Sequence, residues 1–457
     1  MGGERRETGR WMRDRQREGR TTTDSARART WWTDPVSMEL VEPSVWTARM
    51  LEALERGVKG GKWHSLYDKV YQNKSLAAAW KQVEQRKGSG GVDGVSMAAF
   101  RARADKRLVR LGEQLREGTY EPQAVKRVWI PKGGGKLRPL GVPVIIDRVV
   151  QMSLRNAIEP IFEKKFVECS YGFRAGRGCK DALRQVSRGL KRGRTWVVDV
   201  DIEQYFDSID KKRLMTELAT EIADGSVLGL IEKFLQQDVI DGMKRWRPER
   251  GTPQGAVISP LLANIYLHPV DVGMTADGYE MVRYADDMVI LCESREKAEM
   301  ALQRLHELLT ERGLTLHPFK TRVVDATIRP GFDFLGYRFF SKFRYPRPSS
   351  EKKLRSSIRE KTPRTSGASL TEIIKQANAT LRGWFEYFKH SSRHAFDAID
   401  AYVRMRLRSI LRKRSKRKGR GGGHDHFLWP NAYFQQHGLF SLAERHVLLR
   451  QSVKSVH

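Results

Sequence analysis

Apolar residues recur at helical spacing through the N-terminal part of the chain, as in Val45 to Leu54 and Ser75 to Glu84, and again from Arg148 to Phe162. Two other stretches predict strands. Residues 195 to 200, TWVVDV, are mostly apolar, and Met281 to Cys292 has apolar residues on both sides of an acidic turn. Strands scattered among helices without regular βαβ spacing predict an α+β fold.

The pattern changes beyond Phe340. Residues 341 to 367 are highly charged and contain three prolines, which predicts a connection into a second domain. Apolar residues then recur at i, i+3, i+4 and i+7 from Leu381 to Phe388, and with helical spacing from Phe396 to Ile410, so both stripes predict buried helix faces. The second helix also carries six basic residues, expected on its outer face: Arg404, Arg406, Arg408, Arg412, Lys413 and Arg414. Such a face fits a phosphate backbone, and a merely solvated face is the alternative.

The net charge narrows the choice of partner. The chain has 457 residues, and its 84 Lys and Arg against 54 Asp and Glu give a charge of +30. A surplus of this size in a chain with enough apolar residues for a core indicates a polyanionic partner, with nucleic acid as the first candidate. The basic residues are spread over the whole length and form no single juxtamembrane cluster, which argues against a membrane surface.

The chain ends and the cysteines indicate a cytoplasmic protein. Cys169, Cys179 and Cys292 form no CxxC pair, which favours a reducing compartment. No apolar run approaches the ~18 to 20 residues of a membrane span, and the charged N-terminus lacks a signal peptide. Residues 1 to 44 are Arg-rich and predict a flexible basic arm.

Two acidic segments predict a metal site. Asp286 and Asp287 lie in the turn between the strands expected at 281 to 292, and Asp199 and Asp201 would share one face of the strand before them because side chains alternate along a strand. Two strands that each offer carboxylates can hold two divalent ions ~3.5 to 4 Å apart, which suits transfer at a phosphorus centre. Carboxylate oxygens favour Mg²⁺.

Several motifs in order resemble those of the bacterial group II intron reverse transcriptases, also called maturases, over roughly residues 60 to 450. The motifs are GVDGVS at 91–96, IPKGGGKLRPLGVP at 130–143, YGFRAGRG at 171–178, DIEQYFDSID at 201–210, GTPQGAVISPLLANIYL at 251–267, YADD at 284–287, FDFLGYRF at 332–339 and LRGWFEYF at 381–388. The resemblance implies a right-hand polymerase fold, with fingers and a palm of antiparallel sheet followed by a helical thumb. The implied boundaries are an arm at 1–44, fingers and palm at 45–345, thumb or maturase domain at 346–420 and a C-terminal tail at 421–457 without an HNH endonuclease domain.

The resemblance also implies roles for individual residues. Asp201, Asp286 and Asp287 match the catalytic triad that binds two Mg²⁺ ions, and Asp199 matches no family position. The nucleotide-binding positions are Lys132, Arg138, Phe206 and Gln254, with Phe206 either excluding a 2′-hydroxyl or serving as a core phenylalanine. The primer or template positions are Gly336, Tyr337 and Lys320, with a core tyrosine as the alternative at 337.

The function implied by the resemblance is RNA-directed DNA synthesis from a primer 3′-hydroxyl. The expected partners are an RNA template with a DNA primer, deoxynucleoside triphosphates, target DNA and the group II intron RNA, whose splicing and mobility the protein would assist, with the six thumb cations as RNA contacts. Two alternatives stay open. One is a free-standing reverse transcriptase in phage defence or DNA repair, and the other is a splicing-only RNA-binding maturase.

Overall fold

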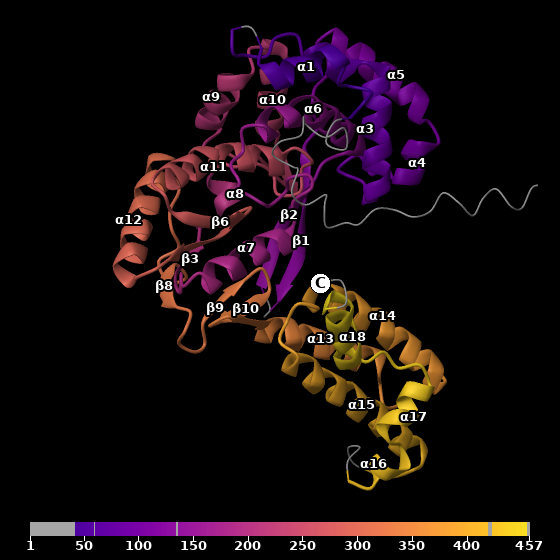
Figure 1. The fold of residues 1–457 in the computed structure, drawn as a ribbon. Helices are drawn as coiled ribbons and strands as arrows, with labels where there is room; N and C mark the ends of the chain where they lie inside the picture. Colours follow the sequence, from indigo (N-terminus) through magenta and orange to yellow (C-terminus); the bar gives the residue numbers. More distant parts are fainter. Residues whose placement is uncertain (1–41, 59, 134–135, 419–422, 455–457) are drawn as a thin grey trace, which may run out of the picture.

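The computed structural model describes residues 42–58, 60–133, 136–418 and 423–454. The expected basic arm at 1 to 44 lies almost wholly outside these residues. The described chain forms two lobes, a larger one built from residues up to about 346 and a smaller helical one that follows it (Figure 1). No helix in this part of the chain is both long and apolar enough to cross a bilayer.

The N-terminal part of the larger lobe is helical. Its central helix, α6 (Ile145–Glu163), is buried along most of its length, and α2 and α3 pack directly on it. Thr47 and Ser96 begin α1 and α4 because their hydroxyls accept hydrogen bonds from backbone N–H groups three residues on. The helices are α1 (Ala48–Arg56), α2 (Tyr67–Tyr71), α3 (Asn73–Arg86), α4 (Met97–Arg101) and α5 (Ala104–Arg116).

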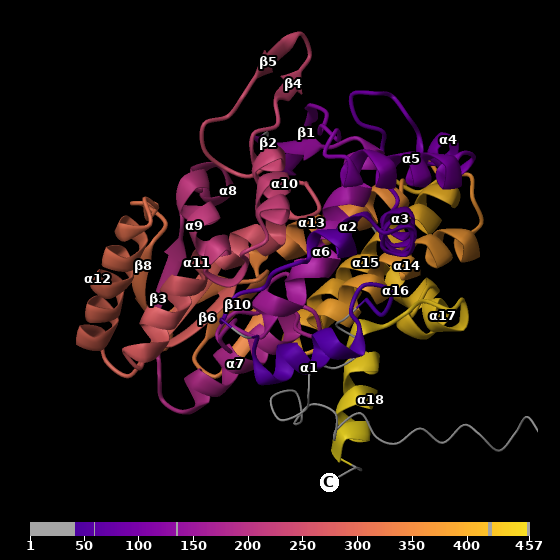
Figure 2. The same cartoon turned by 90° about the horizontal axis from the view of Figure 1, so that it is seen from above.

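A long hairpin of β1 (Val125–Gly133) and β2 (Lys136–Val142) leaves this helical part. Ile130 pairs with Arg138 and Gly133 with Lys136, so the strands run through most of the PKGGGK motif. β1 also pairs in parallel with β4 (Val239–Asp241), and β5 (Lys244–Trp246) completes the sheet in the order β2-β1-β4-β5. The β4–β5 hairpin projects from the edge of the molecule (Figure 2).

The central sheet is antiparallel and has the strand order β6-β7-β3-β8. One of its faces, with Val198 and Ile290, packs in the main core together with α11 and α12, and the other, with Val197 and Leu291, packs on α7. Its strands are β3 (Trp196–Asp201), β6 (Glu280–Tyr284), β7 (Asp287–Cys292) and β8 (Arg322–Asp325), and these confirm the strands predicted around 195–200 and 281–292. The helices of this region are α7 (Cys179–Lys191), α8 (Tyr205–Ser208), α9 (Lys211–Glu221), α10 (Gly225–Leu235), α11 (Ser259–Ala276) and α12 (Arg295–Glu311).

A small three-stranded sheet joins the two lobes. Its strands are β9 (Phe332–Phe334), β10 (Tyr337–Phe340) and β11 (Phe343–Pro346), in the order β11-β10-β9. β9 contacts β3 and β7 of the central sheet. The small sheet therefore lies between the acidic strands and the helices that follow.

The smaller lobe has its own core and corrects two expectations. Residues 341–367, expected as a connection, form β11 and all of α13. The described residues 423–454 of the segment expected as a tail, 421–457, contribute helices to the core. Phe434 and Leu442 are fully buried there, because they pack in one core with the apolar faces of α14 and α15 and remove those faces from water. The helices are α13 (Pro348–Lys361), α14 (Leu370–Phe388), α15 (His394–Arg414), α16 (Asp425–Leu428), α17 (Asn431–Gln436) and α18 (Leu442–Lys454).

Candidate active site

Acidic residues from two strands meet at one end of the central sheet. β3 runs antiparallel to β7 in the register that pairs Asp201 with Asp287, so the two side chains project from neighbouring strands on the same face. Asp286 lies in the two-residue turn between β6 and β7, next to Asp287. The structure therefore places the three aspartates that the sequence singled out at one edge of the sheet.

The turn that carries Asp286 is held in an unfavourable backbone conformation. Ala285 has a φ of +59°, in the left-handed region that L-residues adopt only where the surroundings hold them. Gly172, from the YGF motif, lies directly behind it. A Cβ atom at Gly172 would lie 2.3 Å from the nitrogen of Ala285, so only glycine allows this close approach.

A buried arginine holds the same turn from inside the larger lobe. Arg283 is 1% exposed, and its Nη1 donates to the carbonyl of Ala285 and to Oδ1 of Asn264, both at 3.0 Å. Its Nε donates to Asp271 at 2.6 Å, and Nη2 donates to Ser170 at 2.8 Å and to Asp271. All N–H groups of the guanidinium thus have acceptors, and Asp271 balances its charge.

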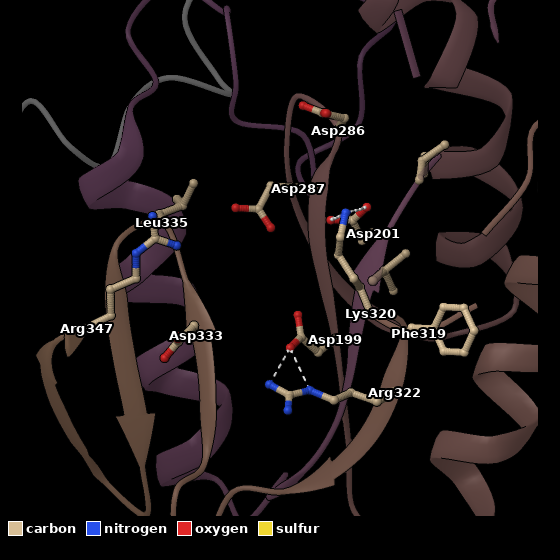
Figure 3. Close-up of a pocket in the computed structure, with 12 residues that line it drawn as sticks. Asp199, Asp201, Asp286, Asp287, Phe319, Lys320, Arg322, Asp333, Leu335 and Arg347 are labelled. Atoms are coloured by element: carbon tan, nitrogen blue, oxygen red, sulfur yellow. Dashed lines mark hydrogen bonds and ion pairs between the residues drawn. The ribbon is translucent and has the colours of Figure 1, made fainter. Parts of the chain in front are cut away.

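The carboxylate face of the sheet forms one wall of a cleft of about 500 Å³ (Figure 3). Leu335 and Arg347, from the turn after β9 and the start of the smaller lobe, line the opposite side. Asp199 lines the cleft below Asp201, and Arg322 binds it with nitrogens 3.1 and 3.2 Å from Oδ2. The charge of Asp199 is therefore paired with that of Arg322 inside the cleft.

Lys320 lies at the mouth of this cleft, next to Asp201. Its Nζ is 3.0 and 3.2 Å from the two carboxylate oxygens of Asp201. The segment around Lys320 wraps the end of β3, because His317 donates its N–H to the carbonyl of Asp201 at 2.8 Å and Thr321 donates its hydroxyl to the same carbonyl at 3.2 Å. Contact of Lys320 with template or primer stays a prediction.

Electrostatics at the cleft favour a bound cation. Burial raises the pKa of Asp287 to about 7, the charges of Asp199 and Asp286 push it in the same direction, and the backbone of Leu335 and the charge of Arg347 oppose the rise. Carboxylates that repel each other in a partly buried place are stabilised by a divalent ion between them.

The donor atoms fit Mg²⁺, although they are not gathered around one point. Within the described ranges, no group of three His, Cys, Asp or Glu side chains is close enough to hold a metal ion. Figure 3 shows Asp287 directed into the cleft, Asp286 above it at the tip of the hairpin, and Asp201 facing Lys320. All three aspartates offer the hard oxygen ligands that Mg²⁺ prefers.

A second cavity, of about 820 Å³, lies beside the same hairpin. It is lined by Asp286 and Asp287 and by three of the predicted nucleotide-binding residues, Arg138, Phe206 and Gln254. Nε of Arg138 donates to Oε1 of Gln254 at 3.0 Å, which joins the β1–β2 hairpin to the PQG loop. A cavity of this size is typical of small-molecule sites.

Phe206 is fixed against the wall of this cavity. Its side chain is only 8% exposed, and its ring packs edge-on against Tyr205 with 5.4 Å between the ring centres. Its carbonyl accepts the N–H of Thr252 at 2.9 Å. The two interpretations of Phe206 are therefore compatible, since the ring is largely buried and still lines the pocket.

Lys132, the fourth predicted nucleotide-binding residue, lies at the end of β1, and its side chain lies outside the described residues.

Tyr337 requires a correction. We expected it to contact primer or template, but its side chain is 1% exposed and packs against Phe388 with ring centres 4.9 Å apart. Its hydroxyl donates to the carbonyl of Tyr387 at 2.5 Å. Alternation along β10 directs Tyr337 into the core between the lobes, so it is the core tyrosine of the alternative interpretation. Gly336, with a φ of +81°, stays a candidate through its backbone.

The six thumb cations do not form one outer face. Arg408 is 3% exposed and binds the carbonyl of Trp429 at 2.9 Å and the side chain of Asn431 at 2.8 Å, so its predicted RNA contact is wrong. The reason is that the segment after α16 covers this side of α15. Three others also bind within the lobe: Arg406 contacts Thr362, Arg412 contacts Asp425 and Arg414 contacts Ala368.

Arg404 and Lys413 are the remaining members of the basic set. In the part of the chain that the structure describes, neither side chain forms a hydrogen bond or ion pair with another residue, and Lys413 is exposed. These two side chains are therefore the better candidates for RNA contacts on α15.

Sequence reasoning missed Arg283 and its partners on α11. A hint is its position, one residue before the YADD motif and directly after the apolar Met281 and Val282. Charge alone could not separate it from the many exposed arginines.

The fold and this site define a right-hand polymerase, and comparisons with known proteins agree. The family described as "Reverse transcriptase (RNA-dependent DNA polymerase)" matches residues 130–339, and "Group II intron, maturase-specific domain" matches residues 351–428. "Protein YkfC" of Escherichia coli (strain K12) is 33% identical over 347 residues, which are 67% of this chain and 90% of YkfC.

Two relatives carry intron names. "Group II intron-encoded protein LtrA" of Lactococcus lactis subsp. cremoris is 38% identical over 169 residues, 37% of this chain and 28% of LtrA. "Putative COX1/OXI3 intron 1 protein" of Saccharomyces cerevisiae is 29% identical over 285 residues, 50% of this chain and 34% of that protein. The matched parts thus span about a third or less of these two relatives. The chain belongs to the group II intron reverse transcriptases, RNA-directed DNA polymerases with a maturase domain.

Proposed function

We propose that the protein extends a DNA primer on an RNA template, with Asp201, Asp286 and Asp287 as the ligands of two Mg²⁺ ions. The ions would activate the primer hydroxyl and neutralise charge on the departing pyrophosphate. The observation that carries this proposal is the register of β3 and β7, which sets Asp201 beside Asp287, and Asp287 in turn lines the nucleotide-sized cavity.

The residues around the cavity have separate tasks in this proposal. Arg138, together with Lys132, would bind the triphosphate, because guanidinium and ammonium groups stabilise phosphate oxygens. Gln254, held by Arg138, would contact the nucleotide, and the buried ring of Phe206 would leave no room for a 2′-hydroxyl. Gly336 and Lys320 would lie along the primer and template.

The same protein would bind its group II intron RNA and assist splicing and mobility, with target DNA as a further partner. The maturase-specific match to residues 351–428 supports this part over a free-standing reverse transcriptase in defence or repair. Arg404 and Lys413 on α15 are the proposed RNA contacts. We place fingers and palm before about residue 346 and the thumb after it, and the three free cysteines support a cytoplasmic location.

Isosteric substitution of the hairpin carboxylates tests the proposal. Asp286→Asn with Asp287→Asn should lower deoxynucleotide incorporation on a primed RNA template by at least ~100-fold, because the ligand charge is lost. Asp333→Asn is a matched control, since Asp333 lines the same cleft but pairs with Arg338 at 2.7 Å. Intron RNA binding should survive in all variants.

The outcome separates the alternatives. Unchanged synthesis in the double variant would refute the site assignment, and absence of synthesis by the wild type together with intact RNA binding would favour a splicing-only maturase.

A further inference from the structure

The turn between β9 and β10 has a strained backbone and lies between the cleft and the thumb. Leu335 has a φ of +47° and Gly336 a φ of +81°, as in the two-residue turns that match the twist of a hairpin. Glycine adopts this conformation freely, but leucine does not. A leucine persists there only when its surroundings hold it.

Residues of the thumb side hold both carbonyls of this turn. Tyr387, near the end of α14, donates its hydroxyl to the carbonyl of Leu335 at 2.7 Å. The carbonyl of Gly336 accepts the N–H of Arg347 at 3.0 Å and the hydroxyl of Ser350 at 3.2 Å. The only bond to the strained leucine among these comes from Tyr387.

The other side of the turn faces the catalytic residues. Leu335 lines both the cleft and the nucleotide cavity together with Asp287, and the backbone of Leu335 lowers the pKa of the Asp287 carboxyl.

We propose that Tyr387 is a positioning residue for the polymerase centre: its hydroxyl fixes the Leu335 turn, and the turn in turn orients Asp287. This inference rests on the proposed function of the aspartates. If so, Asp287 is correctly oriented as a metal ligand only when α14 packs against the Leu335 turn. The thumb would then affect nucleotide incorporation as well as RNA binding.

The test removes one hydroxyl. Tyr387→Phe keeps the ring and loses the bond to Leu335, and Tyr402→Phe is the matched control. Tyr402 also lies in the thumb and donates its hydroxyl to one carbonyl, that of Arg355 at 3.2 Å, but has no link to the turn. Each variant is assayed by single-nucleotide incorporation with separate kcat and KM, and by Mn²⁺ binding followed by electron paramagnetic resonance without turnover.

Loss of one hydrogen bond predicts a kcat about 3- to 10-fold lower for Tyr387→Phe and weaker Mn²⁺ binding, with unchanged affinity for primer and template. Tyr402→Phe should match the wild type. Equal behaviour of the two variants, or a change confined to primer–template affinity, would overturn the inference. If the wild type synthesised no DNA, the proposed function would fail, and the Mn²⁺ comparison would still test the role of Tyr387.

A second substitution tests the strain. Leu335→Gly lets the turn keep its left-handed conformation without support. In that background Tyr387→Phe should have an effect at least about threefold smaller than in the wild type. An equal effect in both backgrounds would mean that Tyr387 acts elsewhere than through the turn.

Discussion

Neutralising Asp271 tests whether a buried ion pair holds the catalytic turn. Asp271 is fully buried, and its two oxygens accept hydrogen bonds from Arg283, whose Nη1 also binds the carbonyl of Ala285. Asp271→Asn keeps the shape of the side chain but leaves the guanidinium charge without a counter-ion. Breaking one partner of such a buried pair costs about 3–5 kcal/mol. The free energy of unfolding of a single domain is about 5–15 kcal/mol. The Asp271→Asn variant should therefore be much less stable than the wild type but still fold.

The control uses an exposed pair from the same region. Asp277, directly after α11, binds Arg304 at 2.7 Å with side chains 39% and 36% exposed. Asp277→Asn should leave the free energy of unfolding almost unchanged, because water already screens this pair. Urea unfolding followed by tryptophan fluorescence compares the two variants with the wild type. If Asp271→Asn unfolded at the same urea concentration as Asp277→Asn, the ion pair would not be what stabilises the turn.

Two further predictions concern other buried groups. Burial raises the pKa of Asp147 to about 7, above its value of about 3.9 in an unfolded chain. The contribution of this group to the free energy of unfolding is therefore fully present below about pH 4. It falls by about 4 kcal/mol in total as the pH rises from 4 through 7. The difference in unfolding free energy between wild type and Asp147→Asn should follow this slope, and a flat difference from pH 4 to 8 would contradict it. Phe206→Ala should raise ribonucleotide use relative to deoxynucleotide use about tenfold or more in primer extension. The interpretation of Phe206 fails if the wild type already accepts ribonucleotides freely.

Local periodicity and ordered motifs were enough to predict the palm. Alternation along the strand predicted that Asp199 and Asp201 share one face, and both line the same cleft. The apolar runs around the acidic turn became β6 and β7. The pattern succeeds here because the strands are buried, and burial on a sheet leaves a direct trace in the sequence. The apolar stripes also predicted α14 and α15 correctly, because one face of each helix is buried and that burial repeats in the sequence with the helical period.

Predictions failed where contacts distant in sequence decide which way a side chain faces. Arg408 looks like an exposed cation until Trp429 and Asn431 fold over it, and Tyr337 looks like a stacking ring until α14 packs on β10. The pairing of Lys320 with Asp201 also depends on contacts distant in sequence, because the chain before β8 wraps the end of β3. A single sequence carries no signal for such pairings, since each partner is unremarkable by itself.

The position of Tyr387 gives a reason why RNA binding and DNA synthesis should influence each other. α14 lies within the maturase-specific region, residues 351–428, and its Tyr387 touches the turn that lines the catalytic cleft. An RNA that binds more tightly when α14 is seated on the palm must favour the state in which Leu335 is held. Linkage makes such a coupling reciprocal, so a nucleotide and metal ions that favour the aligned Asp287 must strengthen RNA binding by the same factor. Affinity for intron RNA measured with and without nucleotide should therefore differ in the wild type and much less in Tyr387→Phe.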